Sequence, residues 1–386
     1  MHVLFLPSWY PSHRHDVAGS FFREQGHALR RAGVKVGVIA PRVRSIKQPN
    51  VLLKGIRKIS LEDDDAVVTV RGNFPNLTPR MWFVTRFTYG LFVLGMFDRY
   101  VEQNGMPDIV HVHSALPGGI GAMAIQKKYS IPYVLSEHST AFARGLVNDG
   151  GRTLTKEIAE RSAACFAVSA VFARKLEQIL TVREGLFSYV HNSVSDIFLT
   201  NPLPKTASGR FRFLHVSSLT NVKRVDLLLN AFAERFRGNP DVSLTIGGQG
   251  ALSFSLKALS EELGVADQVE FTGPLLRHEV AEHMAKSSAF VLPSDFETFG
   301  VVLIEALAMG LPVIATRSGG PEDIITDDYY GLLVPKGDVS ELGMAMEKMI
   351  KMLPLRNPEK IRNDCLLRFG TKKITRDWIA IYSNAI

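Results

Sequence analysis

The sequence is poor in cysteine and has no long uninterrupted apolar run. It holds two cysteines in 386 residues. Cys165 and Cys365 lie far apart and outside any CxxC or zinc-ligand pattern, which favours reduced thiols in a cytosolic protein over a disulfide or zinc framework. No stretch reaches about 18 clean apolar residues, and the nearest candidate, residues 81–97, is interrupted by Arg86, so a transmembrane helix is not expected. The N-terminus has no basic leader, which argues against a signal peptide.

The sequence also lacks dense basic blocks, although the chain carries a net charge of +7. Residues 1–200 account for +8 and the remainder for −1. A basic half favours an anionic partner, such as an acidic membrane surface or a phosphorylated acceptor, and a solvated surface without a partner is the alternative. Dispersed basic residues without a reader motif argue against nucleic acid.

Short apolar runs alternate with longer amphipathic stretches along the chain, which predicts βαβ units and parallel sheets covered on both faces. The expected strands are residues 2–6, 35–40, 66–70, 108–113, 133–136 and 165–168, and then 212–216, 242–246, 269–272, 289–293 and 313–316. Residues 199–210, LTNPLPKTASGR, interrupt this rhythm and predict a linker. We therefore expect two doubly wound α/β domains, residues 1–198 and 211–372, with ligands near the carboxyl ends of the strands.

Two glycine turns follow predicted strands. Gly19 precedes a predicted helix that begins near Ser20, where a phosphate could approach the positive end of the helix. Gly247, Gly248 and Gly250 lie in TIGGQGAL and would allow a nucleotide to approach the backbone. The GxGxxG pattern is not satisfied, so a purely conformational role is the alternative for both turns.

Two cations, Lys223 and Arg224, lie between a predicted strand and a predicted helix in SLTNVKRVDLLLNAF. Cations at that position suit a diphosphate, and two exposed loop cations without a ligand are the alternative.

Three histidines gather at predicted strand ends. His111 and His113 share one face of the strand in HVH, and His138 follows the next strand in SEHST. No carboxylate or cysteine joins them at a suitable spacing, so we expect no metal site and interpret them as cleft residues.

Two carboxylates flank an apolar segment in SDFETFGVVLIEALAMG. Glu297 lies in the loop after a predicted strand, and Glu305 lies inside the apolar helix expected over residues 301–309. A buried carboxylate needs hydrogen-bond donors, which sugar hydroxyls or a nearby cation could supply.

In this order the motifs resemble the retaining glycosyltransferases of family 4, which have the GT-B fold. The resemblance covers nearly the whole chain and is most specific in the carboxyl half. There LPSDFETFGVVLIEALAMGLPVIAT contains the family's E-x7-E pair and is followed by SGGPEDI and GLLV. It implies two Rossmann-like domains facing across a cleft, with residues 373–386 as a helix that returns to the first domain.

The resemblance also assigns roles to residues of the second domain. Glu297 looks like the acid that binds donor-sugar hydroxyls, and Glu305 looks like the ligand of the ribose hydroxyls. Phe299, Gly300 and Val301 look like the backbone segment that cradles the diphosphate and the sugar.

Further roles are implied at four positions. Lys223 matches the lysine that neutralises the diphosphate, and Gly248 lies in the family's glycine turn. Gly19 matches the first-domain glycine near the phosphates, and His138 matches the histidine beside the reacting sugar.

The chain departs from the family pattern at one position. The family has an arginine five positions before the lysine, where this chain has Ser218, and Arg224 is the local substitute.

The implied reaction is metal-independent transfer with retention and without a cofactor. The donor is a nucleotide-sugar, with a UDP-sugar favoured over a GDP-sugar. The acceptor is a glycan or a lipid-linked sugar that meets the basic first domain, in bacterial surface polysaccharide assembly for the cell envelope. The expected location is the cytoplasm, including the inner face of the cytoplasmic membrane, which residues 79–101 with their arginines and aromatics could contact. An ordinary core helix with arginines at its rim is the alternative for these residues. The alternatives are a nucleotide-sugar epimerase or phosphorylase on the same fold, and a non-catalytic sugar-nucleotide-binding protein.

Overall fold

The chain forms two compact units in a computed structural model, which describes residues 1–386 apart from 14–15, 17–18, 46–58, 77–80, 201–202 and 204–208. Unit 1 comprises Met1–His191 and Ile374–Ile386, and unit 2 comprises Asn192–Lys373. Unit 2 thus begins earlier than the sequence predicts. The reason is that Val194 N donates to the carbonyl oxygen of Phe369 at 2.9 Å, inside unit 2. Most of the predicted linker lies outside the described residues.

Unit 1 is built on an eight-stranded sheet in the order β3-β4-β2-β1-β5-β6-β7-β8. Its strands are β1 (His2–Pro7), β2 (Lys35–Ser45), β3 (Ser60–Asp64), β4 (Val67–Asn76), β5 (Ile109–His113), β6 (Tyr133–Glu137), β7 (Ala164–Ala167) and β8 (Phe187–Tyr189). Its helices are α1 (Ser20–Arg31), α2 (Trp82–Asn104), α3 (Ile120–Tyr129), α4 (Asp149–Arg161) and α5 (Ala170–Leu180). The strands pair in parallel, except for the antiparallel hairpin of β3 and β4.

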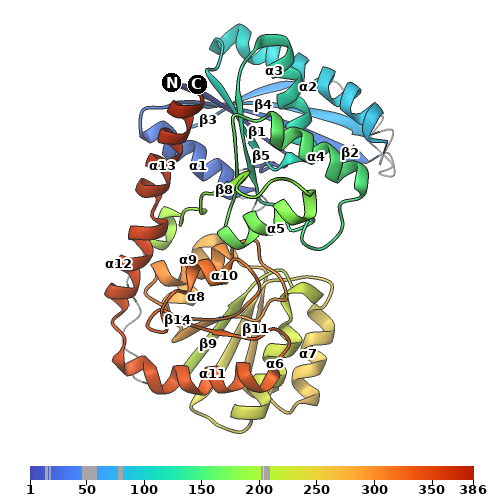
Figure 1. Cartoon of the computed structure of the whole chain (residues 1–386). Helices are drawn as coiled ribbons and strands as arrows, with labels where there is room; N and C mark the ends of the chain where they lie inside the picture. The colour runs from blue at the N-terminus through green and yellow to red at the C-terminus, as the bar shows by residue number, and fades with distance from the viewer. Residues whose placement is uncertain (14–15, 17–18, 46–58, 77–80, 201–202, 204–208) are drawn as a thin grey trace. The chain divides into compact units, whose positions relative to one another are not determined.

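Helices cover both faces of the unit 1 sheet (Figure 1). One face packs on α1 and on α13 (Thr371–Ala385), through a core that includes Phe5, Leu29 and Trp378. On the other face, α2 and α3 pack on each other and α2 contacts β2 and β4. The carboxyl-terminal helix thus supplies Ile374, Trp378 and Tyr382 to the core of unit 1. Within the described ranges, the helices fall short of the combined length and apolar character that crossing a bilayer requires.

Unit 2 is built on a six-stranded parallel sheet in the order β11-β10-β9-β12-β13-β14. Its strands are β9 (Phe211–Val216), β10 (Val242–Gly247), β11 (Val269–Gly273), β12 (Ala289–Leu292), β13 (Val313–Thr316) and β14 (Gly331–Val334). Its helices are α6 (Val225–Phe236), α7 (Ser253–Glu262), α8 (Arg277–Ala285), α9 (Val301–Ala308), α10 (Pro321–Ile324), α11 (Val339–Met352) and α12 (Pro358–Phe369).

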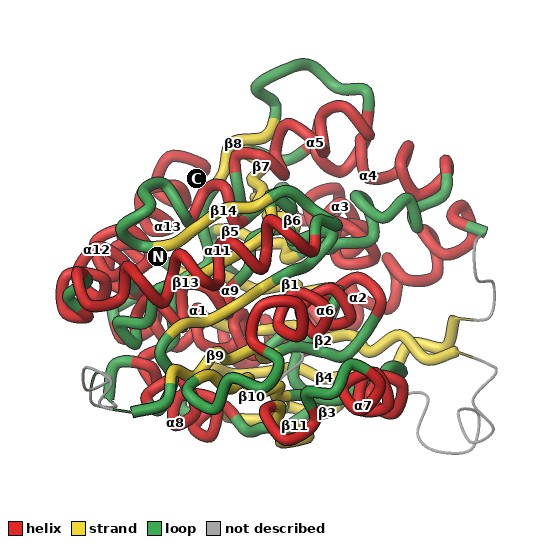
Figure 2. The backbone as a smooth tube through the Cα atoms, turned by 90° about the horizontal axis from the view of Figure 1, so that it is seen from below, coloured by secondary structure: helices red, strands yellow, loops and turns green. Residues whose placement is uncertain are grey.

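The unit 2 sheet is also covered on both faces. The helices α6 and α11 pack on each other and share one core with β9 and β10, and Figure 2 shows both helices against the strands. The helix α8 contacts β9, the helix α9 contacts β12, and α12 packs on α9. The prediction of two doubly wound α/β domains is confirmed, and the cleft implied for the pair stays a prediction.

Candidate active site

A lysine and a glutamate form an ion pair at the carboxyl edge of the unit 2 sheet. The loop after β9 carries Lys223 and the loop after β12 carries Glu297, and these strands are neighbours in the sheet. Lys223 Nζ donates to Glu297 Oε1 at 2.6 Å, and Ser294 Oγ donates to the same oxygen at 2.7 Å. Glu297 is 8% exposed, so two donors hold its carboxylate in a partly dehydrated position where the ion pair is weakly screened.

Backbone hydrogen bonds fix the loop that carries Glu297. Asp295 N donates to the Val222 carbonyl at 2.9 Å, which joins this loop to the loop of Lys223. Glu297 N donates to the Ser318 carbonyl at 3.0 Å, and Gly320 N donates to the Glu297 carbonyl at 2.9 Å. The pair is therefore held by main-chain bonds from three loops, which is the rigid support that a preorganised polar site requires.

The segment Phe299–Val301 leads from this loop into α9. Gly300 has φ 99°, a left-handed conformation that favours glycine, and it immediately precedes the first helical residue, Val301. The backbone of Phe299 lies so close to Gly320 that a Cβ added at Gly320 would be 2.1 Å from the Phe299 Cα. The first N–H groups of a helix have no intrahelical partner, so this turn offers donors and a positive dipole end beside Glu297.

Glu305 pairs with a cation inside unit 2. It is 8% exposed on α9, and Arg277 Nη2, from the first residue of α8, donates to Glu305 Oε1 at 2.8 Å. The sequence left sugar hydroxyls and a nearby cation as donors to the Glu305 carboxylate. The structure shows the cation, Arg277, in this role. The Arg277 guanidinium also lies over the ring of Phe198, 5.5 Å from its centroid.

The glycine turn after β10 packs against the loop of Lys223. Gly248 has φ 117°, and a Cβ there would lie 1.8 Å from the Ser217 carbonyl oxygen. A Cβ at Gly250 would lie 2.3 Å from the Leu219 carbonyl oxygen. This close approach gives both glycines a packing reason, and a contact of Gly248 with a nucleotide stays a prediction.

Arg224 differs from its neighbour Lys223 in its partners. Its guanidinium makes ion pairs with Asp226 at 3.1 Å and with Asp295 at 3.2 Å. Ser218, which replaces the family's arginine, is exposed. The charge of the predicted substitute is therefore already shared between two carboxylates, and this leaves Lys223 as the better placed of the two cations for a diphosphate.

The first-domain candidates, Gly19 and His138, both lie near Phe22. Gly19 has φ 78°, and a Cβ there would lie 3.0 Å from Trp9 Cδ1 and 3.3 Å from Phe22 Cδ2. The rings of Phe22 and His138 have centroids 4.9 Å apart. Unit 1 thus brings these two predicted residues to one place, and their contacts with a substrate stay predictions.

Ser136 Oγ connects the three histidines, of which His111 and His113 are buried and His138 is half-buried, and it lies 3.2 Å from His113 Nδ1. His111 Nδ1 lies 2.7 Å from Tyr382 Oη and His111 Nε2 lies 2.8 Å from Ser136 Oγ, which lies 2.9 Å from His138 Nε2. Desolvation lowers the pKa of His138 to about 3 and the pKa values of His111 and His113 well below the ordinary range. His138 is therefore neutral at physiological pH, where its ring can donate one hydrogen bond and accept another.

Glu137 fixes the loop that carries His138. The amides of His138 and Ser139 donate to Glu137 Oε1 at 2.9 and 2.8 Å, and Ala115 N donates to Glu137 Oε2 at 2.8 Å. Burial raises the pKa of Glu137, and these backbone bonds oppose the shift. Glu137 is not among the residues predicted from the sequence, although a carboxylate beside a strand-end histidine is a signal that could have identified it.

One group of three side chains in the described part of the chain offers metal-ligand atoms close together: His27, Asp64 and Asp65, whose atoms lie within 4.8 Å of one another. Arg23 Nη2 donates to Asp64 Oδ1 at 2.7 Å, so a guanidinium already engages that carboxylate. The expectation that the reaction uses no metal stays a prediction.

Comparisons with known proteins match both halves of the chain. The profile described as Glycosyl transferases group 1 matches residues 204–362, and that described as Glycosyltransferase Family 4 matches residues 18–196. An uncharacterized glycosyltransferase of Methanocaldococcus jannaschii is 30% identical over 68% of this chain and 69% of its own length. The N-acetyl-alpha-D-glucosaminyl L-malate synthase of Bacillus anthracis is 26% identical over 78% of this chain and 81% of its own length.

Solved structures match the fold over the whole chain. Alr3699/HepE of Anabaena, solved in complex with UDP, has a TM-score of 0.75 at 18% identity and covers 99% of this chain and 100% of its own. The two Rossmann-like α/β domains have the architecture of the GT-B glycosyltransferases.

Proposed function

We propose a function for this chain from the premise that it belongs to glycosyltransferase family 4. It transfers a sugar from a nucleotide-sugar to a glycan or lipid-linked acceptor, with retention of the anomeric configuration and without a metal. The observation that carries the proposal is the Lys223–Glu297 pair beside the first turn of α9. A UDP-sugar is the favoured donor, in line with the UDP bound in the structure of HepE, and a GDP-sugar is the alternative.

The proposed site acts on the donor by electrostatics. Lys223 and the first N–H groups of α9 stabilise the negative charge that develops on the leaving diphosphate. Glu297 accepts hydrogen bonds from hydroxyls of the donor sugar. Glu305 accepts hydrogen bonds from the ribose hydroxyls, and its contact with Arg277 adjusts to admit them.

The proposed chemistry needs no protein nucleophile. The acceptor hydroxyl attacks from the face that the diphosphate leaves, and a phosphate oxygen takes its proton. A retaining hydrolase instead needs two carboxyl groups that flank the bond closely. Here Glu297 Oε1 already accepts hydrogen bonds from Lys223 and Ser294, and Glu305 is bound to Arg277. These contacts support a role in holding the donor.

A panel of UDP-, GDP- and ADP-sugars titrated calorimetrically into the full chain tests the donor assignment. We expect the wild type to bind one nucleotide class and Glu305→Gln to weaken that binding about 10- to 100-fold, because it removes a charged acceptor of hydrogen bonds worth about 1.5–3 kcal/mol. Glu261→Gln, at an exposed position of α7, is the matched control. Unchanged nucleotide affinity in Glu305→Gln would show that the ribose assignment is wrong.

The same preparation separates transfer from the alternatives. Incubation with donor alone should leave the sugar of the donor unaltered, whereas an epimerase would change it. Incubation with a glycan extract should release the nucleoside diphosphate and form a glycoside whose anomeric configuration matches that of the donor. Donor binding without turnover on any extract would favour the non-catalytic alternative.

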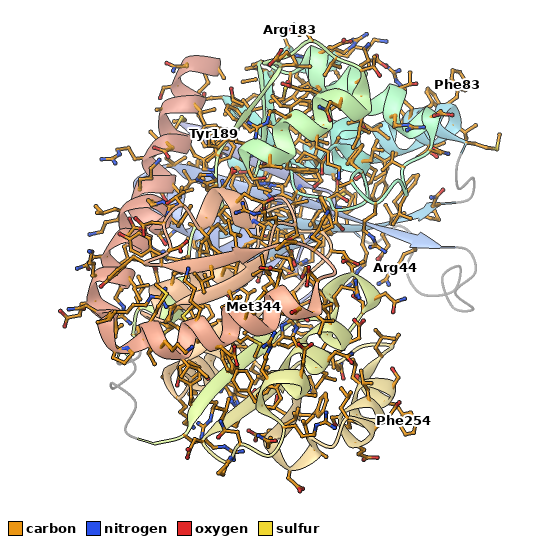
Figure 3. The ribbon with its side chains drawn as sticks, turned by 60° about the horizontal axis from the view of Figure 1, so that its bottom comes forward. Arg44, Phe83, Arg183, Tyr189, Phe254 and Met344 are labelled. Carbon is orange, nitrogen blue, oxygen red and sulfur yellow. The ribbon has the colours of Figure 1, made fainter. Side chains whose placement is uncertain are left out.

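The proposed location includes contact with the membrane surface through α2. Three apolar side chains on α2, Phe83, Phe87 and Leu91, are 88%, 67% and 54% exposed, and their spacing of four puts them on one helix face. We name them the α2 stripe, and Figure 3 shows Phe83 projecting from the surface. Arg86, the cation within this span, makes a bidentate pair with Glu157 at 2.6 and 2.8 Å. The apolar stripe therefore supports peripheral membrane contact more directly than this arginine does.

Phe83→Ser/Phe87→Ser/Leu91→Ser should reduce binding to phosphatidylglycerol vesicles at least ~10-fold, because the insertion of exposed apolar side chains drives interfacial binding. Co-sedimentation measures the effect. Phe254→Ser on α7, where the side chain is 86% exposed, is the matched control. Equal vesicle binding by the wild type and the triple variant, or no binding by either, would contradict a role of the α2 stripe.

A further inference from the structure

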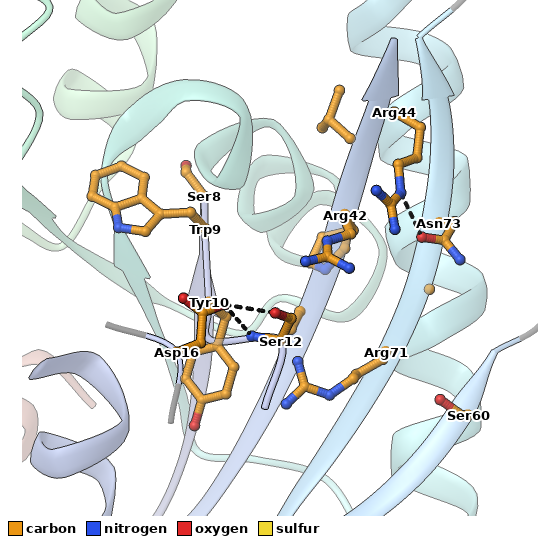
Figure 4. A pocket seen from close by; sticks show the side chains of 14 residues that line it. Ser8, Trp9, Tyr10, Ser12, Asp16, Arg42, Arg44, Ser60, Arg71 and Asn73 are labelled. Atoms are coloured by element: carbon orange, nitrogen blue, oxygen red, sulfur yellow. Dashed lines mark hydrogen bonds between the residues drawn. The ribbon is translucent and has the colours of Figure 1, made fainter. Parts of the chain in front are cut away.

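A cavity of about 430 Å³ opens in unit 1 between the loop after β1 and the carboxyl-terminal halves of β2 and β4 (Figure 4). Its lining combines apolar side chains with hydroxyl groups and basic groups. Hydroxyl groups come from Ser8, Ser12 and Ser60, and three arginines come from the two strands. We call it the arginine pocket. Its lining includes none of Lys223, Glu297 and Glu305, the residues to which the proposed donor site assigns a role.

Strand register brings the three arginines together. Arg42 and Arg44 continue the alternation of Val38 and Ala40 along β2, so their side chains lie on the same face of the sheet as these two core residues. On β4, Arg71 pairs with Ala40 in the parallel register. Figure 4 shows Arg42 and Arg71 reaching from neighbouring strands toward the loop of Tyr10 and Ser12. The core face of the sheet thus changes from apolar to basic just beyond Ala40.

The arginines differ in how their charge is compensated. Arg71 makes an ion pair with Glu62 at 2.6 Å and donates to the Pro11 carbonyl at 2.7 Å. Arg44 Nε donates to the neutral amide oxygen of Asn73 at 3.1 Å. Between Arg42 or Arg44 and the carboxylates of the described residues, no ion pair forms within 4.0 Å. Two guanidinium charges are therefore left without a direct counter-ion.

The nearby acid compensates only part of this charge. Asp16 also lines the pocket, and its Oδ2 accepts hydrogen bonds from Ser12 N at 2.9 Å and Ser12 Oγ at 2.6 Å. Desolvation, followed by repulsion from Arg44 and Arg71, lowers the pKa of Arg42, and attraction by Asp16 opposes the shift. Like charges held together in this way are stabilised by a bound anion.

We propose that the arginine pocket binds the dianionic phosphate of a phosphomonoester on the acceptor, with Arg42 and Arg44 as its ligands. Two guanidinium groups match the charge of such a group, which is close to −2 near neutral pH. The planar fork of each arginine suits paired hydrogen bonds to phosphate oxygens. The proposal rests on the proposed function, because it names the chemical class of the acceptor of that transfer. The phosphate belongs either to a soluble sugar phosphate or polyol phosphate, or to a lipid headgroup.

The test uses the full chain saturated with UDP, so that the proposed donor site is filled before the anion is added. Glycerol 3-phosphate is titrated calorimetrically, with glycerol as the uncharged control. Vesicles containing phosphatidic acid carry the same headgroup on a lipid, and phosphatidylcholine vesicles are their control. Arg42→Gln/Arg44→Gln removes the two charges. Arg30→Gln/Lys127→Gln removes two exposed charges elsewhere in unit 1 and is the matched control.

We expect the wild type and the control variant to bind glycerol 3-phosphate or phosphatidic acid vesicles, and to bind more weakly as salt rises. Arg42→Gln/Arg44→Gln should bind the same probe at least ~30-fold more weakly, since two charge-assisted contacts are lost. Binding of the soluble probe assigns a soluble acceptor, and binding of the vesicles alone assigns a lipid headgroup. Equal affinity in the double variant, or no binding of either probe to the wild type, would overturn the proposal.

Two measurements keep this test separate from the others. Affinity for UDP, and for GDP where UDP does not bind, is recorded for every variant, because a wild type that binds neither nucleotide contradicts the proposed function separately from the pocket. Arg42→Lys keeps the charge but loses the planar fork, and it should weaken binding about 10-fold with an unchanged unfolding temperature. If the double variant does not fold, Arg42→Lys alone tests whether the arginine pocket binds phosphate.

Discussion

Lys223→Gln is expected to lower kcat by about 100- to 1,000-fold, the size of effect seen when one preorganised group that stabilises a developing oxyanion is removed. Lys223 Nζ is held 2.6 Å from Glu297 Oε1, so its charge is in place before the donor arrives. Glutamine keeps a hydrogen-bond donor and removes the charge. The measurement is steady-state release of nucleoside diphosphate, with kcat and KM determined separately.

The matched control for Lys223 is its neighbour. Arg224→Gln should change kcat less than about 10-fold, because Asp226 and Asp295 already compensate the arginine charge. A loss in Arg224→Gln equal to that in Lys223→Gln would contradict the distinction drawn between the two cations. It would instead make Arg224 the substitute for the family's arginine, which is replaced here by Ser218.

Glu297→Ala is expected to lower kcat by about 10- to 150-fold while UDP affinity changes little. The expected loss corresponds to charged hydrogen bonds to sugar hydroxyls worth about 1.5–3 kcal/mol. The Glu297 carboxylate is held by Lys223 and Ser294 in the site and is 8% exposed, so water does not readily replace it. UDP lacks the sugar that Glu297 binds in this account, and its affinity therefore separates binding of the sugar from binding of the nucleotide.

A nearby acid provides the control for Glu297. Asp295 lies two residues earlier in the same loop and pairs with Arg224. Asp295→Asn should retain most of the turnover, since its carboxylate is not assigned to the donor sugar. If Glu297→Ala weakens UDP binding as strongly as it lowers turnover, Glu297 contacts the nucleotide and the sugar assignment is wrong.

The sequence predicts those features that depend on local pattern. Strand and helix positions follow from alternating apolar runs, and β5 and β13 match their expected ranges to within one residue. Lys223 and Glu297 could be predicted to meet because each follows a strand at the carboxyl edge of one sheet, and the structure places them 2.6 Å apart.

One unusual turn and two contacts between distant segments could not be predicted from the sequence pattern. The hairpin of β3 and β4 turns through Asp65 and Ala66, with φ values of 50° and 61°, rather than through an Asn-Gly pair. Arg277 reaches Glu305 from 28 residues away in sequence, where no local spacing signals a pair. The compensation of Arg224 by Asp295 likewise depends on a contact between two loops.

A crystal structure of the full chain with bound UDP tests the central claim, that unit 2 holds the donor at the carboxyl edge of its sheet. The account predicts a β-phosphate within hydrogen-bond distance of Lys223 Nζ and ribose hydroxyls on the Glu305 carboxylate. The claim would be contradicted by UDP bound elsewhere on the chain, with Lys223 still paired to Glu297 and Glu305 still paired to Arg277.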